Sequence, residues 1–255
     1  MITVGIDCGT QRTKAVLVRD GAIQSTAVTR TAFDTNKAAS DVLDLLCSGS
    51  GLPREAVDRI YKTGIGAPTI SFGDGQVNEI MSAAAGVGAL APSCRCILDL
   101  GAERNRAIRL GEQHIVQGYE VNDKCASGSG TFLEAMARVL ETPIESFGAL
   151  ALQHKKDITL SAQCVVFVES EVISLIHQNE QAADIAWGVL TSVASHISAL
   201  VQRLGKVEQV CAIGGLTLNR GLIEALNREM KQEVTVVPYA EYASAYGAAL
   251  LAAKT

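Results

Sequence analysis

One short design occurs twice in this chain of 255 residues: an apolar strand that ends in an aspartate, a glycine turn, and a second apolar strand that returns. The first copy spans residues 2–18, and its first strand ends at Asp7. The second copy spans residues 96–110, with Asp99 in the same place. Apolar strands on both sides of a glycine turn are typical of a β-hairpin. Two such hairpins predict that one structural design is used twice.

Helical periodicity and short strands fill the rest of the chain. The predicted helices span residues 37–46, 79–90, 130–140, 164–176, 183–204, 222–230 and 246–253. Further strands are predicted at 61–66 and 210–215, each leaving through a glycine turn, and at 234–237. Gly and Ala are plentiful, whereas aromatic residues make up only 4%. This combination predicts an α/β fold.

No proline-rich or charged linker separates these elements, which favours two lobes that share a cleft over independent domains. We assign residues 1–93 to an N-terminal lobe, completed by the C-terminal helix at 244–255, and residues 94–243 to a second lobe. With 48% apolar residues, each lobe can bury its own core.

Charge and apolar patterning exclude several classes of protein. The net charge is −5 and no block of Lys and Arg occurs, so a main role in nucleic-acid binding is disfavoured. The N-terminus lacks the basic start, long apolar stretch and cleavage site of a signal peptide, and no later run approaches a membrane span. We therefore expect a cytoplasmic protein with no nucleic-acid or membrane partner.

The seven cysteines have irregular spacing, which argues against a disulfide framework in such a protein. Small buried apolar side chains are the ordinary use of cysteine. We assign that role to five of them: Cys8, Cys47, Cys94, Cys96 and Cys211.

Phosphate binding is the chemistry that the two hairpins favour. A glycine lets backbone N–H groups approach an anion, and Gly9 and Gly101 hold that place in the two turns. Asp7 and Asp99 would hold a hydrated Mg²⁺ that bridges the phosphates, since carboxylates repel phosphate directly. Alone, one Asp-x-Gly-Thr is equally consistent with a plain hairpin turn, but two copies facing each other would clamp one phosphate chain. The Gly214-Gly215 turn would then leave room for adenosine.

At these positions the chain resembles the superfamily of actin, heat-shock chaperone ATPases, hexokinase and acetate kinase. Two further blocks, Val-Asn-Asp-Lys-Cys-Ala-Ser-Gly-Ser-Gly-Thr-Phe-Leu-Glu at 121–134 and Ser-Ala-Gln-Cys-Val-Val-Phe-Val-Glu-Ser-Glu-Val-Ile-Ser at 161–174, resemble the activator ATPases of 2-hydroxyacyl-CoA dehydratases and the ATPase subunits of benzoyl-CoA reductases. The resemblance covers essentially the whole chain. It implies a two-lobed, actin-like ATPase fold with duplicated RNase H-like lobes and ATP and Mg²⁺ in the cleft.

The resemblance also implies a set of site residues. The nucleotide-binding residues are Gly9, Thr10, Gln11, Thr13, Lys14, Gly101, Ala102, Gly214 and Gly215, and the catalytic residues are Asp7, Asp99 and Glu103. One departure concerns the second loop, where the dehydratase activators usually carry Asp-Ile-Gly-Gly-Gln-Asp and this chain has Ala102, Glu103 and Arg104. Glu103 could orient the attacking water and Arg104 could neutralise phosphate charge. The Asp-x-Gly-Ala form resembles one of the benzoyl-CoA reductase ATPase subunits.

Cys125 lies at the mouth of a glycine-rich turn that opens the predicted helix at 130–140, and Cys164 lies at the head of another predicted helix. A helix N-terminus stabilises a thiolate. By themselves the residues leave two alternatives open: cysteines that only pack, or ligands of a soft metal. The resemblance implies a [4Fe–4S] cluster held by both cysteines of each of two protomers, in a homodimer or in a dimer with a paralogue. It further implies ferredoxin or flavodoxin as the electron donor and a CoA-thioester dehydratase or reductase as the acceptor.

Two other functions remain open from the sequence. One is a small-molecule kinase of the same superfamily, although the short chain shows neither a further catalytic Asp nor a sugar-binding insertion. The other is a nucleotide-sensing protein that does not turn over ATP.

Overall fold

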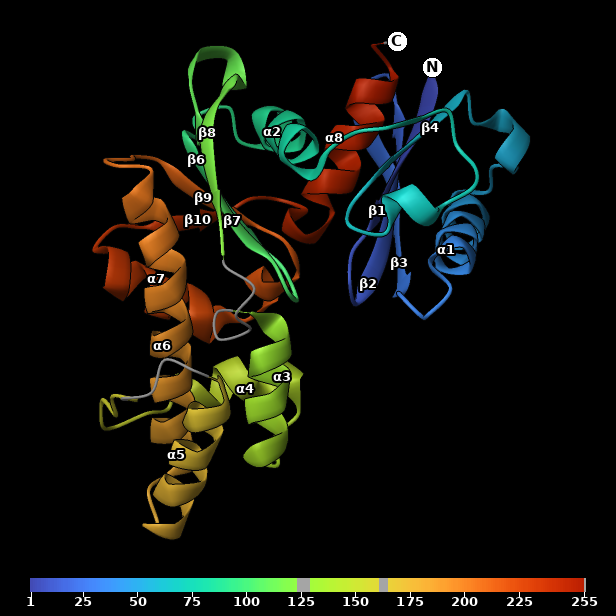
Figure 1. Cartoon of the computed structure of the whole chain (residues 1–255). Coiled ribbons are helices and arrows are strands. Elements are labelled where there is room, and N and C mark those ends of the chain that lie inside the picture. The colour runs from blue at the N-terminus through green and yellow to red at the C-terminus, as the bar shows by residue number, and fades with distance from the viewer. Residues whose placement is uncertain (123–128, 161–164, 255) are drawn as a thin grey trace. The chain divides into compact units, whose positions relative to one another are not determined.

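The computed structural model of the chain describes residues 1–122, 129–160 and 165–254 (Figure 1). The chain divides into two compact units: unit 1 contains Met1–Ile97, Leu110–Gln117 and Val237–Thr255, and unit 2 contains Leu98–Arg109 and Gly118–Val236. The strands are β1 (Ile2–Cys8), β2 (Arg12–Arg19), β3 (Ala22–Arg30), β4 (Arg59–Thr63), β5 (Gly75–Gln76), β6 (Cys96–Leu100), β7 (Asn105–Leu110), β8 (Val116–Val121), β9 (Val210–Ile213) and β10 (Val234–Val236). The helices are α1 (Thr35–Ser50), α2 (Glu79–Leu90), α3 (Gly130–Val139), α4 (Ile144–Ala151), α5 (Val165–His177), α6 (Ala182–Arg203), α7 (Arg220–Met230) and α8 (Ala243–Ala252).

The strands form two five-stranded sheets, in the orders β3-β2-β1-β4-β5 and β10-β9-β6-β7-β8. The two orders correspond when β1 is matched with β6. In the first sheet β2 and β3 lie on one side of β1 and β4 lies on the other. In the second sheet β7 and β8 lie on one side of β6 and β9 lies on the other. In the first sheet β1 is antiparallel to β2 and parallel to β4. The duplication expected from two hairpins therefore extends to two whole sheets.

The third strand of each repeat, β3 or β8, was missing from the sequence-based prediction, as was α4. For β3 a local signal was present. Asp20 and Gly21 form the two-residue loop between β2 and β3, and both have positive φ, at 51° and 83°. Asp-Gly is strongly preferred in the tight turn that needs this backbone conformation at two successive residues.

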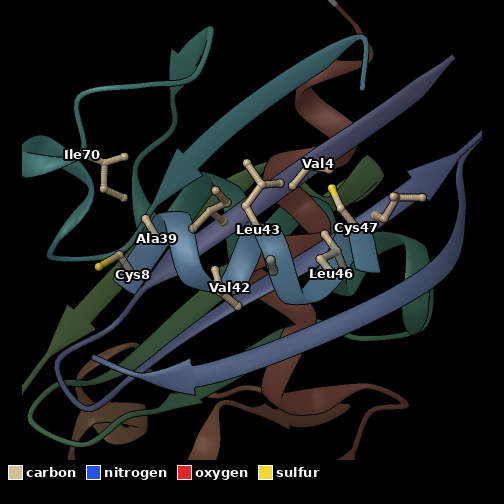
Figure 2. Close-up of a cluster of buried hydrophobic side chains, with 11 residues drawn as sticks. Val4, Cys8, Ala39, Val42, Leu43, Leu46, Cys47 and Ile70 are labelled. Atoms are coloured by element: carbon tan, nitrogen blue, oxygen red, sulfur yellow. The ribbon is translucent and has the colours of Figure 1, made fainter. Parts of the chain in front are cut away.

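Alternation along β2 places its apolar side chains on both faces of the first sheet. Ala15 and Leu17 pack in a core cluster with α1, whereas Val16 and Val18 pack with α8. Figure 2 shows the α1 side, where Leu43 of that helix lies among the buried side chains. Because both faces of the sheet are covered, β2 is apolar almost continuously.

The backbones of β1 and α8 approach each other closely. Thr3 donates a side-chain hydrogen bond of 2.9 Å to the carbonyl oxygen of Ala249. A Cβ added at Gly5 would overlap the carbonyl oxygen of Ala245 and lie 2.6 Å from the amide nitrogen of Ala249. The close packing of this helix on the sheet therefore depends on the missing side chain at Gly5.

We expect Gly5→Ala to destabilise the protein by about 1–3 kcal/mol, because overpacking forces the helix and strand apart. The measurement is urea unfolding of the variant and the parent. Gly118→Ala, whose Cβ would lie 3.8 Å from the nearest side-chain atom, is the matched control and should not lose stability. Equal midpoints for Gly5→Ala and the parent would contradict this account of the packing.

Helix α6 corrects one expectation from the sequence. No run was expected to approach a membrane span, yet α6 has 22 residues and, among the described residues, is long and apolar enough to cross a membrane. In the structure 72% of its apolar window is buried, and the helix packs against α3, α4, α5 and α7 of the same unit. This burial is the pattern of a core helix.

The five cysteines assigned to the core are all buried, which confirms that prediction. Cys8 and Cys47 belong to the cluster shown in Figure 2. Burial raises the pKa of both thiols, so both stay protonated near neutral pH. A protonated thiol is a poor metal ligand, which leaves these two cysteines with a packing role.

Candidate functional site

The first predicted phosphate loop joins β1 to β2 in unit 1. Antiparallel pairing places Asp7 opposite Lys14. The turn is closed by a hydrogen bond of 3.2 Å from the N–H of Gly9 to the carbonyl oxygen of Arg12. Lys14 Nζ lies 3.4 Å from Asp7 Oδ2, and both side chains are largely buried. Asp7 therefore ends its strand beside a cation held by the neighbouring strand.

The second predicted loop joins β6 to β7 in unit 2 and repeats this arrangement. The N–H of Gly101 donates to the carbonyl oxygen of Arg104 at 3.1 Å. Arg106 Nη1 lies 2.7 Å from Asp99 Oδ2, and these two side chains are also largely buried. A Cβ at Gly101 would lie 2.5 Å from the Arg104 oxygen, so this tight turn requires glycine.

The two loops correspond position by position. In each loop the glycine follows the aspartate by two residues. The residue whose carbonyl closes the turn follows it by five, and the buried cation follows it by seven. Lys14 was predicted as a site residue, but its counterpart Arg106 was not. An alignment of the two hairpin sequences places Arg106 opposite Lys14 and would have identified it.

A glycine with positive φ follows the strand beside each loop. Gly64 follows β4 with φ 91°, and Gly214 follows β9 with φ 93°. A Cβ at Gly64 would lie 2.6 Å from Asp7 Oδ1, and a Cβ at Gly214 would overlap the carbonyl oxygen of Leu100. Both glycines thus let a turn approach the end of a strand that carries an aspartate. Gly214 was predicted, whereas Gly64 was missed although the same repeat pointed to it.

The predicted neighbours of Gly9 lie in or next to the first turn. Thr10 and Gln11 are partly exposed there, and the carbonyl oxygen of Gln11 accepts a hydrogen bond of 2.8 Å from the N–H of Thr31. Thr13 is fully buried, and its hydroxyl lies 2.7 Å from that of Thr31. Thr13 therefore fastens the loop to the segment after β3, and its contact with nucleotide stays a prediction.

The second turn presents Ala102 and Glu103 at its tip. Glu103 is exposed, and its backbone carbonyl accepts a hydrogen bond of 3.2 Å from the side-chain amide of Asn122. Behind the turn, buried Asn105 accepts a hydrogen bond of 3.0 Å from the N–H of Gly101. Asn105 was not predicted as a site residue. Its side chain shares the Gly101 N–H with the carbonyl oxygen of Arg104 and so helps to close the turn.

The remaining predicted glycine, Gly215, begins a short 3-10 helix, Gly215–Leu218. A Cβ placed on Gly215 would meet no atom within 4 Å. This position is therefore open, in contrast to Gly214.

Taken singly, each loop offers the groups that a phosphate and its metal ion need. Carboxylate oxygens are the ligands that Mg²⁺ prefers, and turn amides and cationic side chains bind phosphate oxygens. Asp7 and Lys14 lie together in unit 1, and Asp99 and Arg106 lie together in unit 2. The structure thus brings each predicted loop together within its own unit.

The predicted cluster ligands, Cys125 and Cys164, lie outside the described residues. Within residues 1–122, 129–160 and 165–254, no group of three or more His, Cys, Asp or Glu side chains is arranged to hold a metal ion.

A model of the BadF/BadG/BcrA/BcrD ATPase family matches residues 4–252. The activator of lactoyl-CoA dehydratase from Anaerotignum propionicum is 37% identical over 252 residues, which are 99% of this chain and 97% of that protein. One of the subunits of benzoyl-CoA reductase from Thauera aromatica is 35% identical over 260 residues, covering 98% of this chain and 92% of that protein.

Among solved structures, the activator of the 2-hydroxyisocaproyl-CoA dehydratase from Clostridium difficile with bound ADPNP superposes with a TM-score of 0.95 at 34% identity, covering 99% of this chain and 94% of that chain. This likeness confirms the predicted α/β, actin-like ATPase fold. Family model, relatives and structure agree over nearly the whole length, and the chain belongs to the BadF/BadG/BcrA/BcrD ATPase family.

Proposed function

We propose that this ATPase is a cytoplasmic electron-transfer activator, which passes a low-potential electron through a [4Fe–4S] cluster shared by two protomers to a CoA-thioester dehydratase or reductase. The observation that carries the ATPase half is the pair of matching loops, each with a strand-terminal aspartate, a glycine amide and a buried cation. The redox half is supported by relatives named as a dehydratase activator and as part of a reductase.

In this proposal each of the two loops contributes groups that bind ATP and Mg²⁺. Asp7 and Asp99 orient the hydrated metal ion through their carboxylate oxygens, and the tight turns that Gly9 and Gly101 permit bring the loop backbones close to phosphate oxygens. Glu103, exposed at the tip of its turn, orients the attacking water. Thr10, Gln11, Ala102 and Lys14 complete the phosphate side. A bound ADPNP in the structure of a relative supports nucleotide binding by this fold.

The proposed cluster ligands are Cys125 and Cys164 from each of two chains. The choice of these two cysteines comes from the resemblance of the blocks at 121–134 and 161–174 to the activator ATPases, and the other five cysteines are buried. Four thiolates are the ligand set of a [4Fe–4S] cluster, and two chains supply four. The cluster would supply one-electron transfer, with ferredoxin or flavodoxin as donor. The partner protomer is an identical chain or a paralogue.

The test is anaerobic purification followed by iron and sulfide analysis and an ATPase assay. We expect about four iron atoms per dimer, a brown protein and measurable ATP hydrolysis, because one cluster of four irons serves two chains. An iron-free protein that hydrolyses ATP would contradict the redox half alone. An iron-free protein that instead transfers phosphate to a small acceptor would favour the kinase alternative.

The open position at Gly215 gives a prediction for nucleotide binding. We expect Gly215→Val to weaken ATP binding at least about tenfold, because the side chain would occupy the space proposed for adenosine. Since a Cβ there meets no protein atom, folding should be unaffected. Calorimetric titration with a non-hydrolysable ATP analogue measures the affinity, and Gly118→Val in β8 is the control. Unchanged affinity in Gly215→Val would place adenosine elsewhere.

A further inference from the structure

The two phosphate loops carry different cations at the same position. Lys14 on β2 and Arg106 on β7 each follow the aspartate of their loop by seven residues. Lys14 Nζ lies 3.4 Å from Asp7 Oδ2, whereas Arg106 Nη1 lies 2.7 Å from Asp99 Oδ2. A charge-assisted hydrogen bond between nitrogen and oxygen ordinarily spans about 2.7–2.9 Å. The pair in unit 2 therefore has the length of a strong hydrogen bond, and the pair in unit 1 is looser.

Lysine and arginine also differ in how readily they change partner. An ammonium group is a compact charge on a flexible stem, and its N–H donors rotate. A guanidinium group is planar and weakly hydrated, and its donors form a rigid fork that suits a buried carboxylate. Separating a buried ion pair leaves an uncompensated charge, which is costly. Lys14 can therefore turn to a new anion when Asp7 gains another cation, whereas Arg106 is held in place.

The residue before each cation differs between the loops in the same sense. Asn105 precedes Arg106 and is 1% exposed, and its Oδ1 accepts a hydrogen bond of 3.0 Å from the N–H of Gly101. The second loop is thus fastened from within, beside its cation. Thr13 holds that place in the first loop, and its hydroxyl pairs instead with the segment after β3.

The two carboxylates lie beside different groups of the neighbouring turn. Asp7 Oδ1 faces the turn after β4, where a Cβ at Gly64 would lie 2.6 Å from it. The counterpart turn after β9 approaches backbone instead, since a Cβ at Gly214 would overlap the carbonyl oxygen of Leu100. Gly64 thus keeps a side chain from crowding the Asp7 carboxylate, which a hydrated metal ion has to reach.

We propose that the two ion pairs act differently when ATP and Mg²⁺ bind. Lys14 releases Asp7 and turns to a phosphate oxygen. Arg106 keeps its hold on Asp99 and acts as a positioning residue. The inference rests on the proposed function, because it takes ATP and Mg²⁺ as the ligands. Asp7 then presents its whole charge to the hydrated metal ion, since a carboxylate is the ligand type that Mg²⁺ prefers. Mg²⁺ binding therefore depends on Asp7, and the Arg106 pair fixes the shape of the second loop.

Exchanging the two cations tests this difference directly. Lys14→Arg gives the first loop the cation of the second, and Arg106→Lys does the reverse. Lys14→Met removes the competitor for Asp7 and is a second variant of the first loop. Lys37→Arg and Arg54→Lys are the matched controls, because these two cations pair with exposed aspartates of unit 1, at 2.6 Å and 2.7 Å.

The first measurement is the effect of Mg²⁺ on nucleotide affinity, from calorimetric titration with a non-hydrolysable ATP analogue in Mg²⁺ and in EDTA. We expect Mg²⁺ to tighten binding at least about tenfold in the parent and in both controls. In Lys14→Arg this ratio should fall to about threefold or less, because the guanidinium keeps Asp7. In Lys14→Met the ratio should be at least as large as in the parent, although the affinity itself falls. In Arg106→Lys it should stay within about threefold of the parent.

The second measurement separates positioning from stability. Arg106→Lys should unfold at a lower temperature, because an ammonium cannot replace the rigid fork beside Asp99. At a temperature where circular dichroism shows it folded, its kcat should fall at least about tenfold, because the loop no longer holds its geometry. Its affinity for the analogue should stay within about threefold of the parent. A residue that only stabilises the fold would leave kcat unchanged, as Arg54→Lys should.

Equal losses of the Mg²⁺ effect in Lys14→Arg and Arg106→Lys would overturn the inference, because the two aspartates would then act alike. A parental kcat in folded Arg106→Lys would overturn its positioning role. If Lys14→Arg does not fold, Lys14→Met decides: a smaller Mg²⁺ effect than in the parent overturns the exchange. All these outcomes leave the parent an ATPase and so spare the proposed function. A parent whose nucleotide affinity and turnover are independent of Mg²⁺ would contradict both.

Discussion

ATP hydrolysis by Asp7→Asn should fall by about 10²-fold or more, because the amide keeps the shape of the side chain but removes the charge that would hold Mg²⁺. We expect folding to survive, since the Lys14 ammonium is 3.4 Å from Asp7, a looser contact than the 2.7 Å between Arg106 and Asp99. Steady-state phosphate release and thermal unfolding measure the two effects. Asp41→Asn removes a carboxylate from an exposed ion pair with Lys37 and should leave turnover unchanged.

Asp99→Asn is expected to abolish turnover as well, but at a cost in stability that the sequence did not suggest. In the structure Arg106 is 7% exposed and lies 2.7 Å from Asp99. Removing one partner of a buried ion pair typically costs about 3–5 kcal/mol. Turnover should therefore be measured at a temperature where circular dichroism shows the variant folded. Near-parental rates in both folded variants would contradict the phosphate-clamp assignment.

The repeat could be found in the sequence because its signals are local. An apolar strand, an aspartate and a glycine turn lie within a few residues, and the helices α1, α2, α3, α5, α6, α7 and α8 begin and end close to the predicted positions. Helix α4 was missed because only eight residues form it, and its stability comes from packing on α6 and α7. Strand β8 is half-exposed and carries a glycine, which weakens any strand pattern.

The candidate site was predictable where a residue acts through its own turn. Gly9 and Gly101 close their turns by hydrogen bonds to carbonyls three residues later. Arg106 and Gly64 are different, because their roles depend on which strands become neighbours. Burial of a guanidinium beside Asp99, or the approach of a turn to Asp7, appears only when the sheet has formed. Comparison of the two repeats supplies that missing information, since each residue has a partner at the same position in the other copy.

Loss of the iron is the largest effect expected from any single substitution. Replacing Cys125 or Cys164 by Ser removes one ligand from each chain, and the symmetry of the dimer turns this into two of four. The iron content should fall close to zero in either variant when it is prepared under argon. Dimer stability should fall as well, because the proposed cluster ties the protomers together. Nucleotide binding should persist, since the phosphate loops contain neither residue.

The control for this prediction comes from the cysteines that the structure places in the core. Cys47→Ser and Cys211→Ser should keep a full complement of iron, although each puts a hydroxyl into an apolar environment and lowers stability. Iron per dimer and sedimentation velocity therefore have to be measured together. We expect the controls to unfold at a lower temperature but to keep their iron, whereas Cys125→Ser should lose its iron and dissociate. This difference would distinguish a cysteine that binds the cluster from one that only packs. If Cys125→Ser and Cys164→Ser keep their iron, those cysteines only pack, and the electron-transfer proposal loses its ligands.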